Sequence, residues 1–221
     1  MANMSETSYI HGFFFPRRIV RTYAESVLLT DSKFKEHWKK RYDFFLKKIA
    51  FKYNSEQLLL KSPCNTARVE AILELYPDAK FIHIYRNPYD VYRSTERLYE
   101  KILPIASFQK VSNAEMEKYI MHAYESMHRQ YLEKRKDIPK NQLFEMRYED
   151  FVKEPKQHLE KAYQHLGLDR FSAVEDELMK EIKREVDYKK NTYSDIPKAI
   201  KEEINTRWKF AIEAFGYAVE D

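Results

Sequence analysis

The sequence predicts an α/β fold in which helices flank a parallel sheet. Short apolar runs alternate along the chain with longer segments whose apolar residues recur at helical spacing. Two of these runs end in a basic residue, Lys61 or Arg86, directly before a predicted helix. Strands separated by helices pair in parallel through right-handed crossovers. Such folds bind phosphorylated ligands where the strands end, so we expect a ligand site there.

The first half of the chain is predicted to contain two helices and two strands before its central helix. Residues 31–51 have helical spacing, with Trp38 among the apolar residues of one face. Residues 57–61 form a short apolar run that predicts a strand, followed by a helix capped by Asn65 or Thr66. The apolar run 80–85 predicts the next strand.

The central helix has a clear start signal. Asn87 has the position of an N-cap, Pro88 that of the first helical residue, and Asp90 lies three residues beyond the cap, close to a capping box. A longer helix is expected over 113–135 and a third strand over 142–147. Pro155 then opens a helix that Gly167 ends, and the last helix is expected over 197–215.

Composition sets limits on the function. The 221 residues are expected to form a single domain, and 39 basic against 35 acidic residues are interspersed along the helical segments. We therefore expect no nucleic-acid partner. A single cysteine, Cys64, forms no internal disulfide, and no apolar run reaches the roughly 20 residues that span a bilayer. These observations favour a cytoplasmic protein without a membrane partner.

Glycine is scarce, because only Gly12, Gly167 and Gly216 occur. Phosphate-binding loops of the Gly-rich kind need closely spaced glycines, whose backbone N–H groups converge on an anion. The sequence contains no such loop. A small-molecule kinase of similar topology is therefore disfavoured.

The end of the second predicted strand is suited to bind an anion. Arg86 leaves the strand where the next helix offers unpaired N–H groups and the positive end of its dipole. Ser94 lies six residues beyond Pro88, roughly 9 Å along the helix axis, so Arg86 and Ser94 could meet at one phosphate. The residues alone leave an alternative open, in which Arg86 pairs with Asp90 and Ser94 is an ordinary surface hydroxyl.

The segment Tyr85–Ser94 resembles the 3′-phosphate-binding segment of the sulfotransferases that use 3′-phosphoadenosine 5′-phosphosulfate. Further stretches fall in the order of that family: Phe14–Arg17, Leu58–Pro63, Tyr76–Ser94, Arg147–Phe151 and Phe215–Tyr217. The resemblance covers nearly the whole chain and corresponds to the carboxy-terminal two-thirds of the family's domain. It implies a P-loop NTPase-like sheet and transfer of a sulfuryl group to a hydroxyl or amine of an unknown small-molecule or carbohydrate acceptor. It implies no metal.

The resemblance also implies residue roles. Arg86 and Ser94 would hold the 3′-phosphate, and Tyr148 would contact the adenine, although it could equally be a half-buried aromatic residue at a strand end. Lys61 would lie near the transferring sulfuryl group and stabilise charge on the bridging oxygen. A late basic stretch, 189–191, could add phosphate contacts, although short lysine pairs are usually solvated.

The catalytic base does not carry over from the family. Some sulfotransferases have a histidine shortly after the lysine turn, where this chain has Cys64 and Asn65. His83 stands in a strand between apolar residues and is interpreted as a histidine of the core or sheet face. Cys64 is interpreted as a structural thiol rather than a reactive one.

The sequence departs from the family pattern at its beginning. Sulfotransferases have a first strand and a 5′-phosphosulfate loop upstream of every segment matched above, and this sequence starts after them. Two hypotheses follow: the chain is an amino-terminally truncated sulfotransferase domain with a partial nucleotide site, or it is a catalytically silent nucleotide-binding remnant or scaffold. Loss of a central strand is expected to expose apolar surface on its neighbours.

Overall fold

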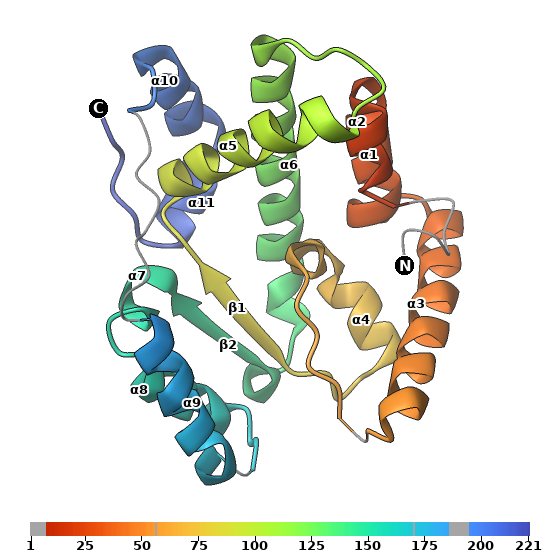
Figure 1. Ribbon diagram of the computed structural model, residues 1–221, viewed down its shortest axis with the longest axis vertical. Helices are drawn as coiled ribbons and strands as arrows, with labels where there is room; N and C mark the ends of the chain where they lie inside the picture. The colour runs from red at the N-terminus through yellow and green to blue at the C-terminus, as the bar shows by residue number, and fades with distance from the viewer. Residues whose placement is uncertain (1–7, 56, 170, 186–194) are drawn as a thin grey trace.

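A computed structural model describes residues 8–55, 57–169, 171–185 and 195–221 of the chain. It has a mixed α/β fold that is mostly helical, with a small parallel sheet of two strands (Figure 1). The helical elements of the first part are α1 (His11–Phe14), η2 (Pro16–Arg18), α2 (Ile19–Tyr23), η3 (Ala24–Leu28), α3 (Ser32–Tyr53), η4 (Pro63–Arg68) and α4 (Val69–Leu75). Then follow β1 (Phe81–Tyr85), α5 (Pro88–Ala106), α6 (Asn113–Lys134), η5 (Arg135–Asp137), η6 (Lys140–Gln142) and β2 (Leu143–Arg147). The last elements are α7 (Tyr148–Phe151), α8 (Pro155–His165), α9 (Phe171–Glu185), α10 (Lys198–Arg207) and α11 (Lys209–Ala214).

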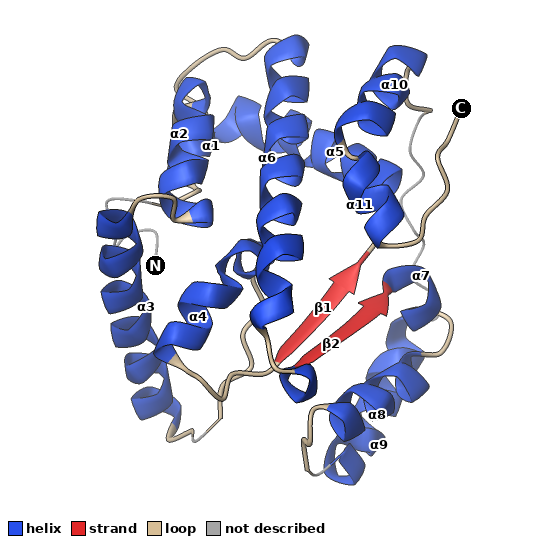
Figure 2. Ribbon diagram, turned by 180° about the vertical axis from the view of Figure 1, so that it is seen from behind, coloured by secondary structure: helices blue, strands red, loops and turns tan. Residues whose placement is uncertain are grey.

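The two strands confirm the predicted parallel pairing. Phe81 lies opposite Leu143 and Tyr85 opposite Arg147, so both strands end at the same edge of the sheet. The connection between them passes through α5 and α6, as a parallel crossover requires. Figure 2 shows the strands side by side, with α8 and α9 near β2. Residues that follow β1 and β2 are thereby brought together.

The strand predicted over 57–61 is wrong. Residues 57–62 form an irregular stretch that leads into η4 at Pro63, so neither Asn65 nor Thr66 caps a helix. The side chain of Leu59 is 96% exposed and that of Leu60 41%. A strand needs a neighbour for its backbone N–H and C=O groups, and the described part of the chain provides none here. The apolar composition alone could not reveal that absence.

Local capping explains where the helices around the sheet begin. The side chain of Asn87 accepts a hydrogen bond from the backbone N–H of Tyr89, which confirms the predicted N-cap of α5. Asp90 forms no capping box there, because its carboxylate pairs with arginines instead. Ser112 and Glu115 form a complete capping box at the start of α6. Gly167, with φ of 57°, adopts the left-handed conformation expected after α8.

The main core lies where α5, α6, α10 and α11 pack against β1. Trp208 is fully buried between α10 and α11; its indole N–H donates to the carbonyl of Met121, 3.2 Å away, and its ring stacks on Tyr124. Because the backbone turns at Trp208, the single helix predicted over 197–215 is divided into α10 and α11. Within the described residues, no helix combines the length and the apolar character needed to cross a membrane.

Candidate functional site

Arg86 and Tyr148 meet at the edge where both strands end. Arg86 is the first residue after β1, and Tyr148 is the first residue after β2, in α7. The guanidinium carbon of Arg86 lies 4.8 Å from the centre of the Tyr148 ring, within the range of a cation–π contact. The parallel register therefore brings together two side chains that are 62 positions apart in the sequence, as shown by the neighbouring pair Asn87 and Glu149.

Arg86 is also paired with a carboxylate. Its Nη2 donates to Oδ2 of Asp90 over 3.2 Å, while Arg93 donates to the other oxygen of Asp90 over 3.3 Å. The structure therefore contains the Arg86–Asp90 pair that the residues alone had left open. A guanidinium has five donors, however, and Nε of Arg86 is buried without a hydrogen-bond partner in the described part of the chain. With 31% of its side chain exposed, Arg86 keeps donating capacity towards a further acceptor.

Ser94 lies on the same face of α5, one turn beyond Asp90. Residues four apart on a helix are neighbours on its surface, so Ser94 follows Asp90 at roughly 6 Å along the axis. Ser94 is exposed, and among the described residues it forms no hydrogen bond with Arg86. Arg86, Asp90, Arg93 and Ser94 thus form a charged and hydroxylated surface at the start of α5, which we call the polar end of α5.

Glu149 occupies a position that sequence reasoning did not single out. Its carboxylate accepts the backbone N–H of Asn87 over 3.0 Å and the hydroxyl of Tyr217 over 2.7 Å. Burial opposes the negative charge of Glu149, but the hydrogen bonds from Tyr217 and Asn87 outweigh it and lower the pKa of this carboxyl. The N–H of Asn87 lies where the sequence predicts unpaired N–H groups for a phosphate. Glu149 therefore already occupies one of these donors. The acidic residue directly after Tyr148 was the available signal.

Arg93 was also missed by sequence reasoning. Besides Asp90, its guanidinium approaches Asp195 at 3.6 Å and Glu220 at 4.0 Å, which ties the start of α5 to the end of the chain. The i,i+3 spacing of Asp90 and Arg93 was the signal that could have indicated it.

Lys61 is not joined to the polar end of α5 by any contact in the described residues. It is exposed in the irregular stretch before η4. Cys64, three residues later, is buried, and burial raises the pKa of its thiol, as a structural cysteine requires. His83 packs its ring 4.1 Å from that of Tyr131 on one face of β1, which confirms a sheet-face histidine. The basic stretch 189–191 lies outside the described residues.

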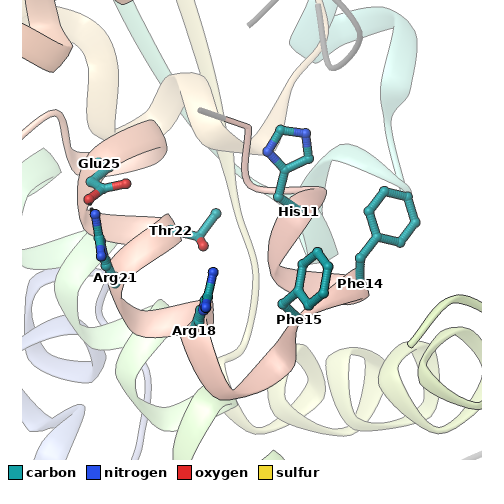
Figure 3. Close-up of a pocket in the computed structure, with 7 residues that line it drawn as sticks. All are labelled: His11, Phe14, Phe15, Arg18, Arg21, Thr22 and Glu25. Atoms are coloured by element: carbon teal, nitrogen blue, oxygen red, sulfur yellow. Dashed lines mark hydrogen bonds and ion pairs between the residues drawn. The ribbon is translucent and has the colours of Figure 1, made fainter. Parts of the chain in front are cut away.

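A separate pocket of about 500 Å³ lies between α1 and α2. In Figure 3, His11, Phe14 and Phe15 line one wall, whereas Arg18, Arg21, Thr22 and Glu25 line the other. The helices α1 and α2 lie at the far end of α5 from β1 and α7 (Figure 1). The pocket is therefore separated from Arg86, which follows β1, and from Tyr148, which begins α7. The sequence had placed Phe14–Arg17 in the family pattern without assigning it a site.

Comparison with known proteins gives one family. The sequence profile described as "Sulfotransferase family" matches residues 8–173. Two curated relatives, each named omega-hydroxy-beta-dihydromenaquinone-9 sulfotransferase Stf3, come from Mycobacterium bovis and Mycobacterium tuberculosis. Each is 31% identical over 182 residues, which are 82% of this chain and 46% of the relative. The chain therefore spans about half the length of these curated relatives. No solved structure matches it significantly.

Proposed function

The chain belongs to the sulfotransferase family, and we propose that it provides the 3′-phosphate part of a site for 3′-phosphoadenosine 5′-phosphosulfate. The observation that carries this proposal is the contact between Arg86 and Tyr148 where two parallel strands end beside the start of α5. An arginine next to an aromatic ring suits a ligand that joins a phosphate to a purine. The nucleotide supplies the activated sulfuryl group that a hydroxyl or amine of the acceptor receives.

The residues of the polar end fit an anionic ligand. Nε of Arg86 is a buried donor without a hydrogen-bond partner among the described residues, and the exposed Ser94 hydroxyl lies one turn beyond Asp90 on the same helix face. We assign Arg86 and Ser94 to the 3′-phosphate and Tyr148 to stacking on the adenine. Asp90 shares the Arg86 guanidinium, so a phosphate would bind through the donors that Asp90 leaves. Lys61 would stabilise negative charge near the transferring group.

The remaining parts of the donor site are proposed to lie on a further strand and loop, as in P-loop NTPase-like sheets. Supporting this, β1 pairs with β2 alone among the described strands, and Ile82 and Ile84 on β1 are 38% and 47% exposed. Apolar side chains on a strand with one free edge suit an element that covers them. The 221 residues would then belong to one sulfotransferase-like domain. The single buried thiol of Cys64 suits a reducing, cytoplasmic compartment.

The acceptor is proposed to be a hydroxyl group on an apolar molecule. The name of the two relatives describes sulfotransfer to an omega-hydroxylated dihydromenaquinone. A molecule of that class joins an apolar body to a hydroxyl. The part of the relatives that this chain matches would contribute to binding such a molecule.

A catalytically silent nucleotide-binding protein is the second candidate. It is favoured by Cys64 and Asn65, which stand where some sulfotransferases have a histidine. The Cys64 thiol is buried with a raised pKa, and an amide such as Asn65 is no proton acceptor at neutral pH. Binding of nucleotide without sulfuryl transfer to any alcohol would support this candidate, whereas measurable turnover would exclude it.

Calorimetry with adenosine 3′,5′-bisphosphate tests the proposed site. Arg86→Ala is expected to weaken binding by about 1.5–3 kcal/mol, the range for hydrogen bonds to charged groups, or roughly 10- to 150-fold. Arg18→Ala removes the same charge from an exposed position in η2, near the other end of α5, and is expected to leave the affinity unchanged. Equal affinities of the wild type and a folded Arg86→Ala variant would refute the assignment of Arg86.

A further inference from the structure

Three phenylalanines form an exposed aromatic cluster beyond the carboxy-terminal end of α5. Phe14, Phe15 and Phe108 are 36%, 42% and 78% exposed. The ring of Phe108 lies 6.1 Å from that of Phe14 and 5.7 Å from that of Phe15, centre to centre. Because the Phe108 ring contacts both other rings, the three form a patch at the surface rather than scattered exposed residues. Contiguous exposed apolar surface of this kind marks an interaction site.

The backbone holds this aromatic cluster in place. The N–H of Phe108 donates to the carbonyl of Phe14 over 3.0 Å, and the N–H of Arg17 donates to the side chain of Gln109 over 3.2 Å. The turn after α1 and the loop between α5 and α6 are thereby tied together at one end of the molecule (Figure 1). Because the rings sit on a fixed scaffold, their exposure is a property of the folded chain.

Basic side chains surround the aromatic cluster. Arg17, Arg18, Arg21 and Lys110 are all exposed, and the guanidinium of Arg18 lies 5.9 Å from the Phe15 ring. Among the described residues, two acidic ones face the same region. Glu25 pairs with Arg21 at 2.7 Å, and Glu115 is held in the capping box of Ser112 with Arg17 nearby. Four cations against two engaged carboxylates leave this rim positive.

The pocket between α1 and α2 likewise combines aromatic rings with basic side chains. Its aromatic wall, which includes Phe14 and Phe15, faces the wall of Arg18, Arg21 and Thr22 (Figure 3). Apolar rings beside cations and a hydroxyl match the boundary between acyl chains and anionic headgroups.

We propose that Phe14, Phe15 and Phe108, with the basic rim around them, dock this chain on the surface of an anionic phospholipid bilayer. The rings enter the headgroup and acyl boundary, and the arginines remain at the level of the lipid phosphates. The charge complementarity favours this partner over a second copy of the chain, whose equally positive rim would repel. Such docking is peripheral, and it revises the expectation of no membrane partner drawn from the sequence.

Vesicle co-sedimentation tests this proposal without nucleotide, so its result is independent of the proposed sulfotransferase site. The wild-type chain is expected to bind vesicles that contain phosphatidylcholine and phosphatidylglycerol, and to bind phosphatidylcholine vesicles much more weakly. The combined change Phe14→Ser, Phe15→Ser and Phe108→Ser is expected to lower binding at least about tenfold. Phe51→Ser is the matched control, because Phe51 is 90% exposed on α3 outside the cluster.

A second variant addresses the charges and the folded state. Arg17→Gln with Arg18→Gln is expected to lower binding to anionic vesicles roughly 30-fold, the effect of two cations at about 1 kcal/mol each. Circular dichroism verifies that each variant is folded. The proposal is overturned if the wild type binds neither vesicle, if Phe51→Ser lowers binding as much as the triple change, or if light scattering shows a dimer that the triple change dissociates.

Discussion

The two ends of helix α5 carry opposite kinds of surface. At its start, Arg86, Asp90 and Arg93 are charged side chains that satisfy one another. Beyond its end, roughly 28 Å away along the axis, the exposed ring of Phe108 contacts the exposed rings of Phe14 and Phe15. At the polar end most of the charges are already paired within the protein, and a few N–H donors are left for a ligand. The aromatic end leaves apolar area uncovered, which indicates a partner of large area rather than a small anion.

Helix α5 is the rigid connection between the two ends, so the largest expected effect comes from its buried side. Tyr92 is fully buried and its ring packs near Trp208. Tyr92→Ala is expected to lower the free energy of unfolding by about 3–5 kcal/mol, because it leaves a cavity in the main core. Urea denaturation followed by circular dichroism measures this.

Glu100→Ala, at an exposed position of the same helix, serves as the control and should stay within about 0.5 kcal/mol of the wild type. A loss below 1 kcal/mol for Tyr92→Ala would show that α5 is not anchored as described, and the two ends could then not be treated as fixed relative to each other.

Acid is expected to weaken the core beneath the polar end. His128 is buried against Tyr124 and Phe215, and Phe215 in turn stacks on Tyr85, the residue before Arg86. Burial lowers the pKa of His128 to about 4. Between pH 6.5 and 4 the unfolded chain therefore binds the proton that the folded chain excludes, and stability falls as the pH falls through this window.

The loss amounts to about 3 kcal/mol, because the pKa of His128 falls from the ordinary 6.5 to about 4. Urea midpoints at several pH values measure it. His128→Phe is expected to remove most of the slope, whereas His158→Phe, at a partly exposed position on α8, is expected to retain it. The Glu145 carboxyl, whose pKa is about 2, adds a separate loss only below about pH 4.5. An unchanged slope in His128→Phe would contradict this account.

The smallest expected effect tests whether the two ends of α5 are independent of each other. Ser112 caps α6 directly after the loop that carries Phe108. Ser112→Ala is expected to lower the free energy of unfolding by about 1 kcal/mol, the usual loss for an N-cap, and to leave the affinity for adenosine 3′,5′-bisphosphate unchanged. Asn113→Ala is the control at the next residue. A fall in nucleotide affinity for Ser112→Ala would show that the two ends are coupled.

Much of the secondary structure was readable from local signals. The start of α5, with Asn87 as its cap, and the parallel pair β1 and β2 follow from short-range chemistry and from apolar periodicity. The strand expected over 57–61 failed, because a strand depends on a neighbour that no local pattern encodes. The division of the last predicted helix at Trp208 depends equally on packing against α6.

The candidate site, too, could be predicted only in part from the sequence. The position of Arg86 at a strand end and of Ser94 on the next helix could be read from the sequence, and so could the family they resemble. The pairing of Asp90 with Arg86 was an alternative that the residues left open, and the structure decided it. That Glu149 holds the N–H of Asn87 could not be read from the sequence, because it depends on how β1 and β2 pair.

By itself, the sequence determined the strands β1 and β2, the Asn87 cap that starts α5 and the family to which the chain belongs. Only the tertiary structure decided which side chains face water together. The turn at Arg17 and the loop at Gln109 are 92 positions apart, and their meeting places three phenylalanines on one surface. Periodicity identifies apolar residues but not whether a neighbour covers them, because coverage is set by how the elements pack against one another.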